Sequence, residues 1–202
     1  MWVVMGGERS LLGNTMTDPL FALRRRVGSD EEISSVLEAT RESLGPKSNP
    51  TGRALVALTL CRLGAPPELV STSLDWREFE GFCAGLLKSS GFEVREDVRL
   101  RMPTAQIDIL AEGPSFVLSV DCKHWSRLMS NAGLEKITAA QLRRSQLFRK
   151  TAGADPRPIF SAILTLSEQR ERFVKGVAIV PLFTLRDFIG SIEAVRGLLT
   201  ES

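Results

Sequence analysis

The sequence predicts an α/β fold in which helices flank a mixed central sheet, in the order αβββαβ, preceded by a small helical region. Three observations lead to this fold class. A β-hairpin pattern lies between residues 106 and 125, helical patterns lie before and after it, and two short apolar runs follow the second helix. The predicted order from residue 75 is therefore helix, three strands, helix, two strands and a final helix.

The composition is that of an ordinary globular protein. The chain has 202 residues, of which 43% are hydrophobic and 25% are charged. This length allows one domain with an appendage or two small domains, and it is sufficient for a sizeable core. The formal net charge of +2 is an excess that neither requires nor excludes a nucleic-acid partner.

The cysteine and histidine content is against a zinc site or a disulfide framework. The three cysteines, Cys61, Cys83 and Cys122, are far apart in the sequence, and His124 is the single histidine. Each cysteine lies in an apolar run, so we expect buried free thiols and a cytoplasmic protein. No stretch approaches the roughly 20 apolar residues that cross a bilayer.

The chain divides into a disordered N-terminus (1–17), a helical region (18–73) and a main domain (74–202). The first segment has no basic start and no sustained apolar run, so a signal peptide is not expected. Met16 is an alternative natural start, which N-terminal sequencing of the native protein would test. The helical region is expected to serve substrate recognition or dimerisation.

The helical region carries two helical patterns. Ser29 and Glu32 predict a capping box for the first helix, which Gly45-Pro46 ends. The second helix covers residues 51–64, and Pro66-Pro67 separates it from the main domain.

The main domain is expected to begin with a helix whose start is strongly marked. Asp75 is a predicted N-cap, and Glu78, three residues later, completes a capping box. The predicted inward stripe consists of Phe79, Cys83, Leu86 and Leu87, with Trp76 on its edge. Glu80 lies on this apolar side and needs a partner. The partner is either an arginine or lysine at the edge of the core, or the acidic cluster of the following hairpin.

The hairpin follows a half-solvated strand at residues 92–102, and it places acidic and basic groups side by side. Its strands are 107–111 and 116–123, joined by a turn at 112–114. Asp121 and Lys123 share one face of the second strand, and Asp108 can lie beside them on the first. A divalent cation would justify two carboxylates at the end of an apolar hairpin, since Mg²⁺ takes one or two carboxylates plus waters and phosphate oxygens. A solvated Asp–Lys pair is the alternative.

The helix after the hairpin covers residues 134–151 and has a basic C-terminal half. Its cations are Arg143, Arg144, Arg149 and Lys150. Some of this charge complements the helix dipole, and four cations without an acid also suit a phosphate backbone. Gln141 lies on the face that also carries Arg144 and Phe148.

Two buried strands and a helix complete the predicted fold. The apolar runs 159–166 and 177–182 are short and rich in β-branched residues, and a charged loop joins them. Thr184 and Asp187 predict a capping box for the last helix.

Four residues in this order resemble the PD-(D/E)XK nuclease superfamily, with Mrr-type restriction endonucleases and archaeal Holliday-junction resolvases as the nearest relatives in pattern. The resemblance covers residues 76–182. Glu80 in FEGFCAGLLKSSGFEV resembles the helix glutamate of the family, Asp108 in QIDIL the first aspartate, and Asp121 and Lys123 in SVDCKHW the (D/E)-x-K. Ile107 replaces the proline of the motif, and Mrr-type proteins often carry glutamine at the place of Asp121.

The resemblance implies a restriction-endonuclease-like core and a Mg²⁺-dependent endonuclease, in which Mn²⁺ can substitute. It implies Asp108 and Asp121 as metal ligands, with the Cys122 carbonyl as a further ligand and Glu80 acting through water or a second ion. Lys123 would orient and activate the attacking water. Gln141 resembles a helix glutamine of several branches, although a core-edge amide is an equal interpretation, and His124 is a possible accessory residue with a structural role as the alternative.

The expected substrate is duplex or branched DNA, cleaved in restriction or in repair and recombination, and the expected assembly is a homodimer. Arg143, Arg144, Arg149 and Lys150 would follow the DNA backbone. Two other functions stay open. One is a catalytically silent DNA-binding module of the same fold, and the other is an RNA endonuclease, because fold does not fix substrate.

Overall fold

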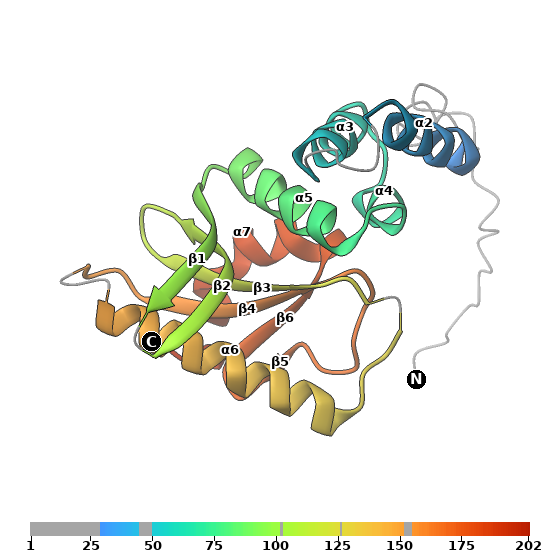
Figure 1. The fold of residues 1–202 in the computed structure, drawn as a ribbon. Helices are drawn as coiled ribbons and strands as arrows, with labels where there is room; N and C mark the ends of the chain where they lie inside the picture. The colour runs from blue at the N-terminus through green and yellow to red at the C-terminus, as the bar shows by residue number, and fades with distance from the viewer. Residues whose placement is uncertain (1–28, 45–49, 102, 126, 152–154) are drawn as a thin grey trace, which may run out of the picture.

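The structure is a computed structural model, and it describes residues 29–44, 50–101, 103–125, 127–151 and 155–202 (Figure 1). The expected disorder of residues 1–17 lies outside this part of the chain. The helical region contains α2 (Asp30–Leu44), α3 (Pro50–Arg62) and α4 (Pro67–Thr72). The capping box of α2 is confirmed, since the Glu32 N–H donates to Ser29 Oγ and the Ser29 N–H donates to Glu32 Oε2.

The main domain has the predicted order of elements, with one additional short strand, β5 (Phe173–Val174), between the last two predicted strands. It consists of α5 (Trp76–Ser89), β1 (Glu93–Arg101), β2 (Thr104–Glu112), β3 (Val117–Lys123), α6 (Asn131–Thr151), β4 (Ile159–Thr165), β5 (Phe173–Val174), β6 (Val177–Pro181), η1 (Leu182–Thr184), α7 (Leu185–Val195) and η2 (Arg196–Leu198). The mixed α/β fold with a preceding helical region is thereby confirmed.

The six strands form one mixed sheet in the order β1-β2-β3-β4-β6-β5. The first three strands pair antiparallel, β3, β4 and β6 pair parallel, and β5 pairs antiparallel with β6. Every residue of β4 and β6 is buried, as expected for parallel strands covered on both faces.

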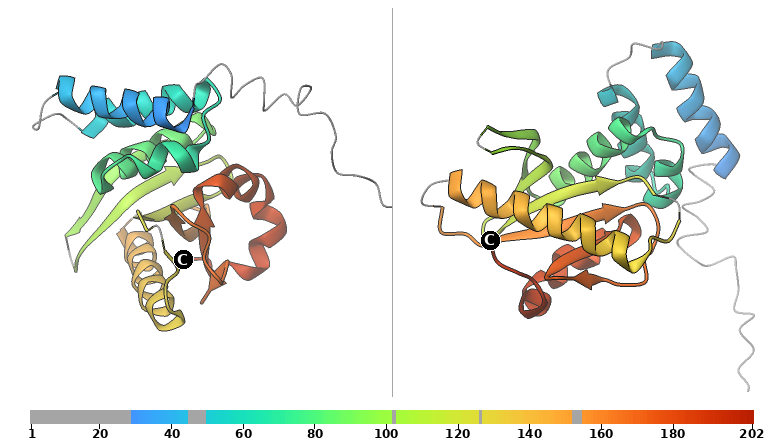
Figure 2. Two further views of the ribbon diagram at one scale, coloured as in Figure 1. Left: turned by 90° about the vertical axis from the view of Figure 1, so that its right-hand side faces the viewer. Right: turned by 60° about the horizontal axis from the view of Figure 1, so that its bottom comes forward.

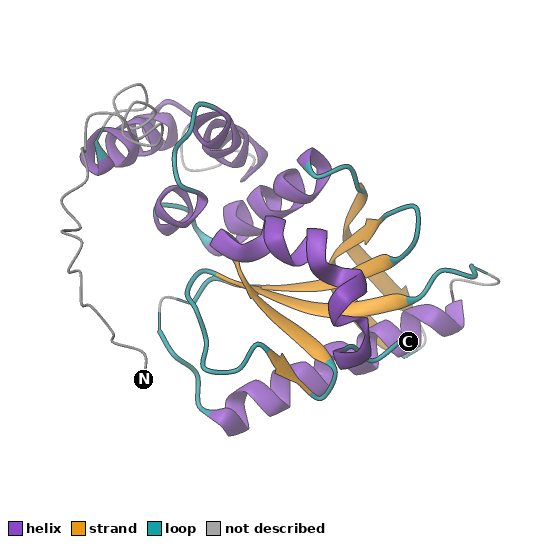
Figure 3. Cartoon of the chain, turned by 180° about the vertical axis from the view of Figure 1, so that it is seen from behind, coloured by secondary structure: helices purple, strands orange, loops and turns teal. Residues whose placement is uncertain are grey.

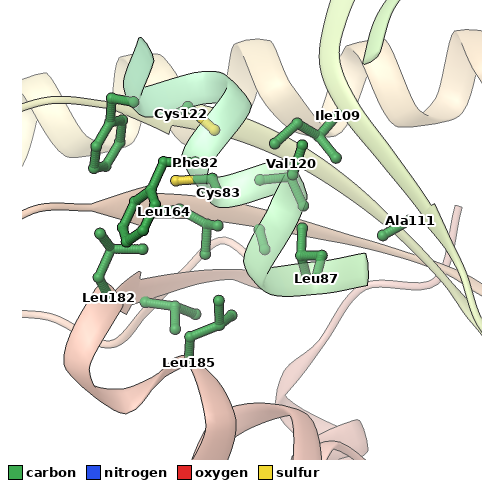
Figure 4. Packing of buried hydrophobic residues seen from close by; sticks show 14 of the residues in the cluster. Phe82, Cys83, Leu87, Ile109, Ala111, Val120, Cys122, Leu164, Leu182 and Leu185 are labelled. Carbon is green, nitrogen blue, oxygen red and sulfur yellow. The ribbon is translucent and has the colours of Figure 1, made fainter. Parts of the chain in front are cut away.

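Helices cover both faces of the sheet. The helices α5 and α7 lie on one face and α6 on the other (Figure 2), and the view from behind shows α7 crossing in front of the strands (Figure 3). Figure 4 shows Cys83 and Leu87 of α5 packed with Val120 and Cys122 of β3 in the larger core. Phe148 of α6 belongs to a smaller core on the opposite face. Three layers therefore hold β3 in the centre of the domain.

The helical region packs directly on α5. The larger core runs without interruption from Ile33 and Leu37 of α2 to Phe79 and Phe82 of α5. Arg53 of α3 is buried in the same region and is 1% exposed. Packing is therefore continuous across the expected boundary between residues 73 and 74.

Several local predictions differ from the structure. Pro67 begins the short helix α4, where no helix was predicted, because proline suits the first helical turn. The predicted loop between the last two strands contains β5. The capping box of the last helix is wrong, since Thr184 Oγ1 donates back to the Pro181 carbonyl and makes no side-chain cap. Trp76 is 58% exposed and lies outside the inward face of α5.

The capping box of α5 and the free cysteines agree with the sequence. The Asp75 side chain accepts from the N–H groups of Arg77 and Glu78, and the Glu78 side chain accepts from the Asp75 N–H. Cys61, Cys83 and Cys122 are free thiols. Among the described helices, none combines the length and the apolar character needed to cross a bilayer.

Candidate active site

The register of the hairpin brings Asp108 and Asp121 together. Ile109 of β2 pairs with Val120 of β3, so continuing the antiparallel register by one residue places Asp108 opposite Asp121. Asp108 Oδ2 accepts a hydrogen bond of 2.9 Å from the Cys122 backbone N–H. Asp108 is therefore fixed to β3 at the point where regular pairing of the two strands stops.

Asp121 is a buried carboxylate between two cations. The residue is 3% exposed. Lys123 Nζ lies 2.5 Å from its Oδ2 atom, and Arg144 Nη1 lies 2.8 Å from its Oδ1 atom. The spacing of two residues puts Asp121 and Lys123 on the same side of β3, whereas Arg144 comes from α6. The two cations offset the cost of burying the aspartate.

Glu80 approaches the same cluster from α5. Of the two partners left open by the sequence, the core-edge arginine belongs to Glu78, whose Oε2 atom lies 2.6 Å from Arg53 Nη1. Burial, followed by the charge of Asp108, raises the pKa of Glu80 to about 7, while Lys123 opposes this shift. Glu80 therefore lies within electrostatic reach of the hairpin cluster.

The carboxylates of the site repel one another. Burial and the charge of Asp121 raise the pKa of Asp108, and the Cys122 N–H, Lys123 and Arg144 lower it. Glu80 and the two aspartates therefore lie within electrostatic reach of one another and of Lys123. A hard divalent cation that binds to carboxylate oxygens would relieve this repulsion.

The donor set suits a cation bound by few protein ligands. Among the described residues, no three acidic, histidine or cysteine side chains are close enough together to form a ligand set. Mg²⁺ is commonly held by one or two carboxylates with waters and phosphate oxygens, and Asp108 and Asp121 can supply that number. The Cys122 thiol is no candidate ligand, because a hydrogen bond with Cys83 and burial raise its pKa well above the usual range.

Gln141 is completely buried beside the site and is bonded on both sides of its amide. Its Nε2 atom donates to the Ser119 carbonyl at 2.8 Å and to Ser119 Oγ at 3.0 Å. Its Oε1 atom accepts from Arg144 Nη1 at 3.2 Å. Gln141 therefore links the centre of β3 to the arginine that contacts Asp121.

His124 has structural contacts. Its Nε2 atom lies 2.9 Å from the Ser71 carbonyl, and its ring packs edge-on against Phe79 with centroids 5.0 Å apart. Because a carbonyl only accepts, Nε2 must carry the proton. His124 thus ties the end of β3 to α4 and to α5, which supports the structural interpretation.

The four basic residues in the C-terminal half of α6 separate into three kinds. Arg143 and Lys150 are exposed, and Arg144 faces Asp121. Arg149, a predicted phosphate contact, donates from its guanidinium to the backbone carbonyls of Ser202, Asp155 and Arg157. These hydrogen bonds connect α6 to the C-terminus and to the α6–β4 connection.

Two residues near the site were missed from sequence. Ser119, a small polar residue inside an apolar strand, was the available signal for a polar partner on α6. Asp97 adds to the negative charge that raises the pKa of Glu80. It lies in β1 with a φ of 51°, and the β1–β2 register places it opposite Asp108. A left-handed aspartate inside a strand leaves no sequence signal.

Glu80→Gln is expected to change the pH dependence of stability in the presence of a chelator. The folded-state pKa of about 7 exceeds the ordinary value of 4.5, so the folded protein binds more protons than the unfolded chain between these values. Stability should therefore fall as pH rises through this window. The variant lacks this loss and should exceed wild type at pH 8 by about 1–2 kcal/mol, a value reduced for solvent screening.

Urea unfolding at pH 5 and pH 8 measures the difference. Glu171→Gln, at an exposed glutamate, is the control and should follow the wild type at both pH values. Parallel stability curves for wild type and Glu80→Gln would contradict the raised pKa.

The region that holds the site matches a known protein family. The Mrr_cat family model, described as a restriction endonuclease, matches residues 71–189, more than half of the chain. Among solved structures, the crystal structure of AF1548, a protein of unknown function, is similar at 17% sequence identity with a TM-score of 0.40. That similarity covers 60% of this chain and 66% of the other, which is less than two thirds of it. No curated protein matches the chain.

Proposed function

The chain belongs to the Mrr_cat restriction endonuclease family, and we propose that it is a metal-dependent endonuclease that hydrolyses phosphodiester bonds of DNA. The supporting observation is that Asp108, Asp121 and Lys123 lie together at the end of one hairpin. Glu80 is close enough that their charges change its pKa. The proposed role is restriction, or DNA repair and recombination.

Asp108 and Asp121 are the proposed ligands of Mg²⁺, which Mn²⁺ can replace, with the Cys122 carbonyl as a further ligand and Glu80 acting through water. When bound, the cation supplies Lewis-acid activation of the phosphoryl group. Asp108 can keep the hydrogen bond from the Cys122 N–H through Oδ2 and still offer its other oxygen. The strand thereby holds the ligand in a fixed orientation.

Lys123 is the proposed catalytic cation. Its ammonium is held 2.5 Å from Asp121 Oδ2, so it has a defined position before substrate arrives. From there it would orient the attacking water and offset the negative charge that develops at phosphorus. A group already in place costs no reorganisation in the transition state.

Exposed cations on α6 are the proposed contacts to the DNA backbone. Arg143 and Lys150 are exposed, and no side-chain partner is found for either within the described chain. Contacts of this kind position DNA without reading its sequence. We also propose a homodimer on the basis of the family resemblance, which sedimentation velocity would test.

Incubation of the full chain with supercoiled plasmid and Mg²⁺ or Mn²⁺ tests the function. We expect nicking or linearisation that EDTA stops and that Asp121→Ala and Lys123→Ala abolish. The control is Lys88→Ala, which should retain activity. Lys88 is an exposed lysine of α5 that pairs with Glu96 of β1. A panel with a four-way junction, a flap and structured RNA identifies the substrate class.

Each alternative function has its own outcome. Cleavage that persists unchanged in both site variants would contradict the site assignment. Salt-sensitive binding without cleavage of any DNA would indicate the silent binding module, and cleavage restricted to RNA would indicate the RNA endonuclease.

A further inference from the structure

Arg144 occupies an oxygen of Asp121 that a divalent cation would need. Lys123 takes Oδ2 at 2.5 Å and Arg144 takes Oδ1 at 2.8 Å, so a cation already contacts each oxygen of this carboxylate. We propose that Arg144 is an exchangeable counter-ion, which neutralises Asp121 in the metal-free protein and turns to the scissile phosphate once a divalent cation is bound. This inference rests on the proposed function.

Of the two cations, Arg144 can leave the Asp121 carboxylate more readily. Lys123 is two residues from Asp121 on the same strand, so its position follows from the strand itself. Arg144 comes from another element, and its side chain is 31% exposed. Its hydrogen bonds to the described residues use Nη1 alone, to Asp121 and to Gln141, which leaves Nε and Nη2 as donors. The planar guanidinium fork matches phosphate oxygens with two parallel hydrogen bonds.

Gln141 limits how far Arg144 can move. The Ser119 carbonyl can only accept, and Nε2 is the donor of the Gln141 amide, so Nε2 faces β3 and Oε1 faces the arginine. Gln141 is wholly buried and cannot follow the guanidinium into solvent. The amide therefore keeps Arg144 beside Asp121 after the ion pair opens, and Gln141 is assigned as a positioning residue.

Arg144 differs in this respect from the other basic residues of α6. Arg149 is held by three backbone carbonyls on the side of the C-terminus. Arg143 is the neighbouring exposed arginine and has no contact with the acidic cluster among the described residues. Arg143 is therefore a matched control for the loss of one positive charge from the same helix turn.

Calorimetric titration with Mn²⁺ alone tests the counter-ion role without reference to cleavage. Arg144→Met removes the competing charge and keeps the aliphatic stem, so its affinity for Mn²⁺ should increase about tenfold. Arg144→Lys keeps the charge and should stay within about threefold of wild type. Arg143→Met should stay within about twofold, because screening weakens the effect of an exposed charge.

Cleavage kinetics on saturating plasmid test the second role. Arg144→Met and Arg144→Lys should both lose about a hundredfold in kcat, since neither side chain can form the fork at phosphate. Gln141→Met, which removes the amide and keeps the length, should reduce kcat and change Mn²⁺ affinity in the direction of Arg144→Met. Circular dichroism spectra establish that each variant is folded.

The outcomes separate this inference from the proposed function. Mn²⁺ binding and cleavage in wild type, with equal Mn²⁺ affinity in Arg144→Met, would overturn the inference alone. Tighter Mn²⁺ binding in Arg144→Met, together with no cleavage of nucleic acid by wild type, would support the counter-ion role and overturn the nuclease function. Failure of wild type and of Arg144→Met to bind Mn²⁺ would overturn the counter-ion inference and the proposed metal-dependent function together.

Discussion

Asp108→Asn is expected to eliminate DNA cleavage and to leave the protein folded. The asparagine carbonyl can still accept the hydrogen bond that Asp108 Oδ2 receives from the Cys122 N–H, so the hairpin keeps its cross-strand link. The negative charge is lost, and with it a proposed metal ligand. Metal activation of a phosphoryl group supplies several kcal/mol in the transition state, so kcat/KM should fall by about 10²–10⁴-fold.

The stability of this variant distinguishes a chemical from a structural effect. Burial and Asp121 raise the pKa of Asp108, so the folded protein gains nothing from the ionised carboxylate. Asp108→Asn should therefore be at least as stable as wild type in urea at pH 8 without metal. Asp187→Asn, at an exposed aspartate of α7, is the control for both measurements. A variant that keeps cleavage, or that loses it only through unfolding, would contradict the assignment.

Local rules were sufficient to predict the parts of the site that lie on one element or one hairpin. The alternation of side chains along a strand puts Asp121 and Lys123 on one face, and their contact of 2.5 Å agrees with that prediction. A short turn fixes the register that brings Asp108 across. The capping box of α5 follows from spacing as well, because N-cap chemistry involves neighbours three residues apart.

Partners that are distant in the sequence could not be predicted in this way. Arg144 and Asp121 are 23 residues apart and meet because α6 returns over the sheet. Arg149 is in the same basic run as Arg144, and the carbonyls it binds are set by the path of the C-terminus. Identical side chains on one helix thus acquire different roles, since each role depends on which loop or strand happens to face it.

Removal of Arg53 is expected to cause a large loss of stability. Arg53 is buried, with Nη1 at 2.6 Å from Glu78 Oε2, Nη2 at 2.8 Å from the Ser73 carbonyl and Nε at 3.0 Å from the Leu37 carbonyl. It joins α2, the α4–α5 turn and the first turn of α5. Arg53→Met would leave the Glu78 carboxylate buried without a cation. Breaking a buried ion pair in this way typically costs about 3–5 kcal/mol.

A second substitution should return part of that loss. In Arg53→Met with Glu78→Gln the buried charge is gone, and the glutamine carbonyl can still accept from the Asp75 N–H, a bond of 2.7 Å in the wild type. The double variant should therefore be more stable than Arg53→Met alone. Each single substitution should be less stable than the wild type, because it leaves one member of the pair without its partner. Urea unfolding measures all of these proteins. Arg62→Met, at an exposed arginine near the end of the same helix, should stay within about 0.5 kcal/mol of wild type.

The same ion pair is expected to connect the helical region to the active site. Glu78 and Glu80 lie in the first two turns of α5, so a loosened helix start would let the Glu80 carboxylate move away from Asp108 and Asp121. Under conditions where Arg53→Met is still folded, cleavage should therefore decrease, and the double variant should recover part of it. Equal activity of folded Arg53→Met and wild type would show that the Arg53–Glu78 ion pair stabilises the domain without positioning the glutamate. Additive losses in the double variant would show that Arg53 and Glu78 act independently, contrary to their contact at 2.6 Å.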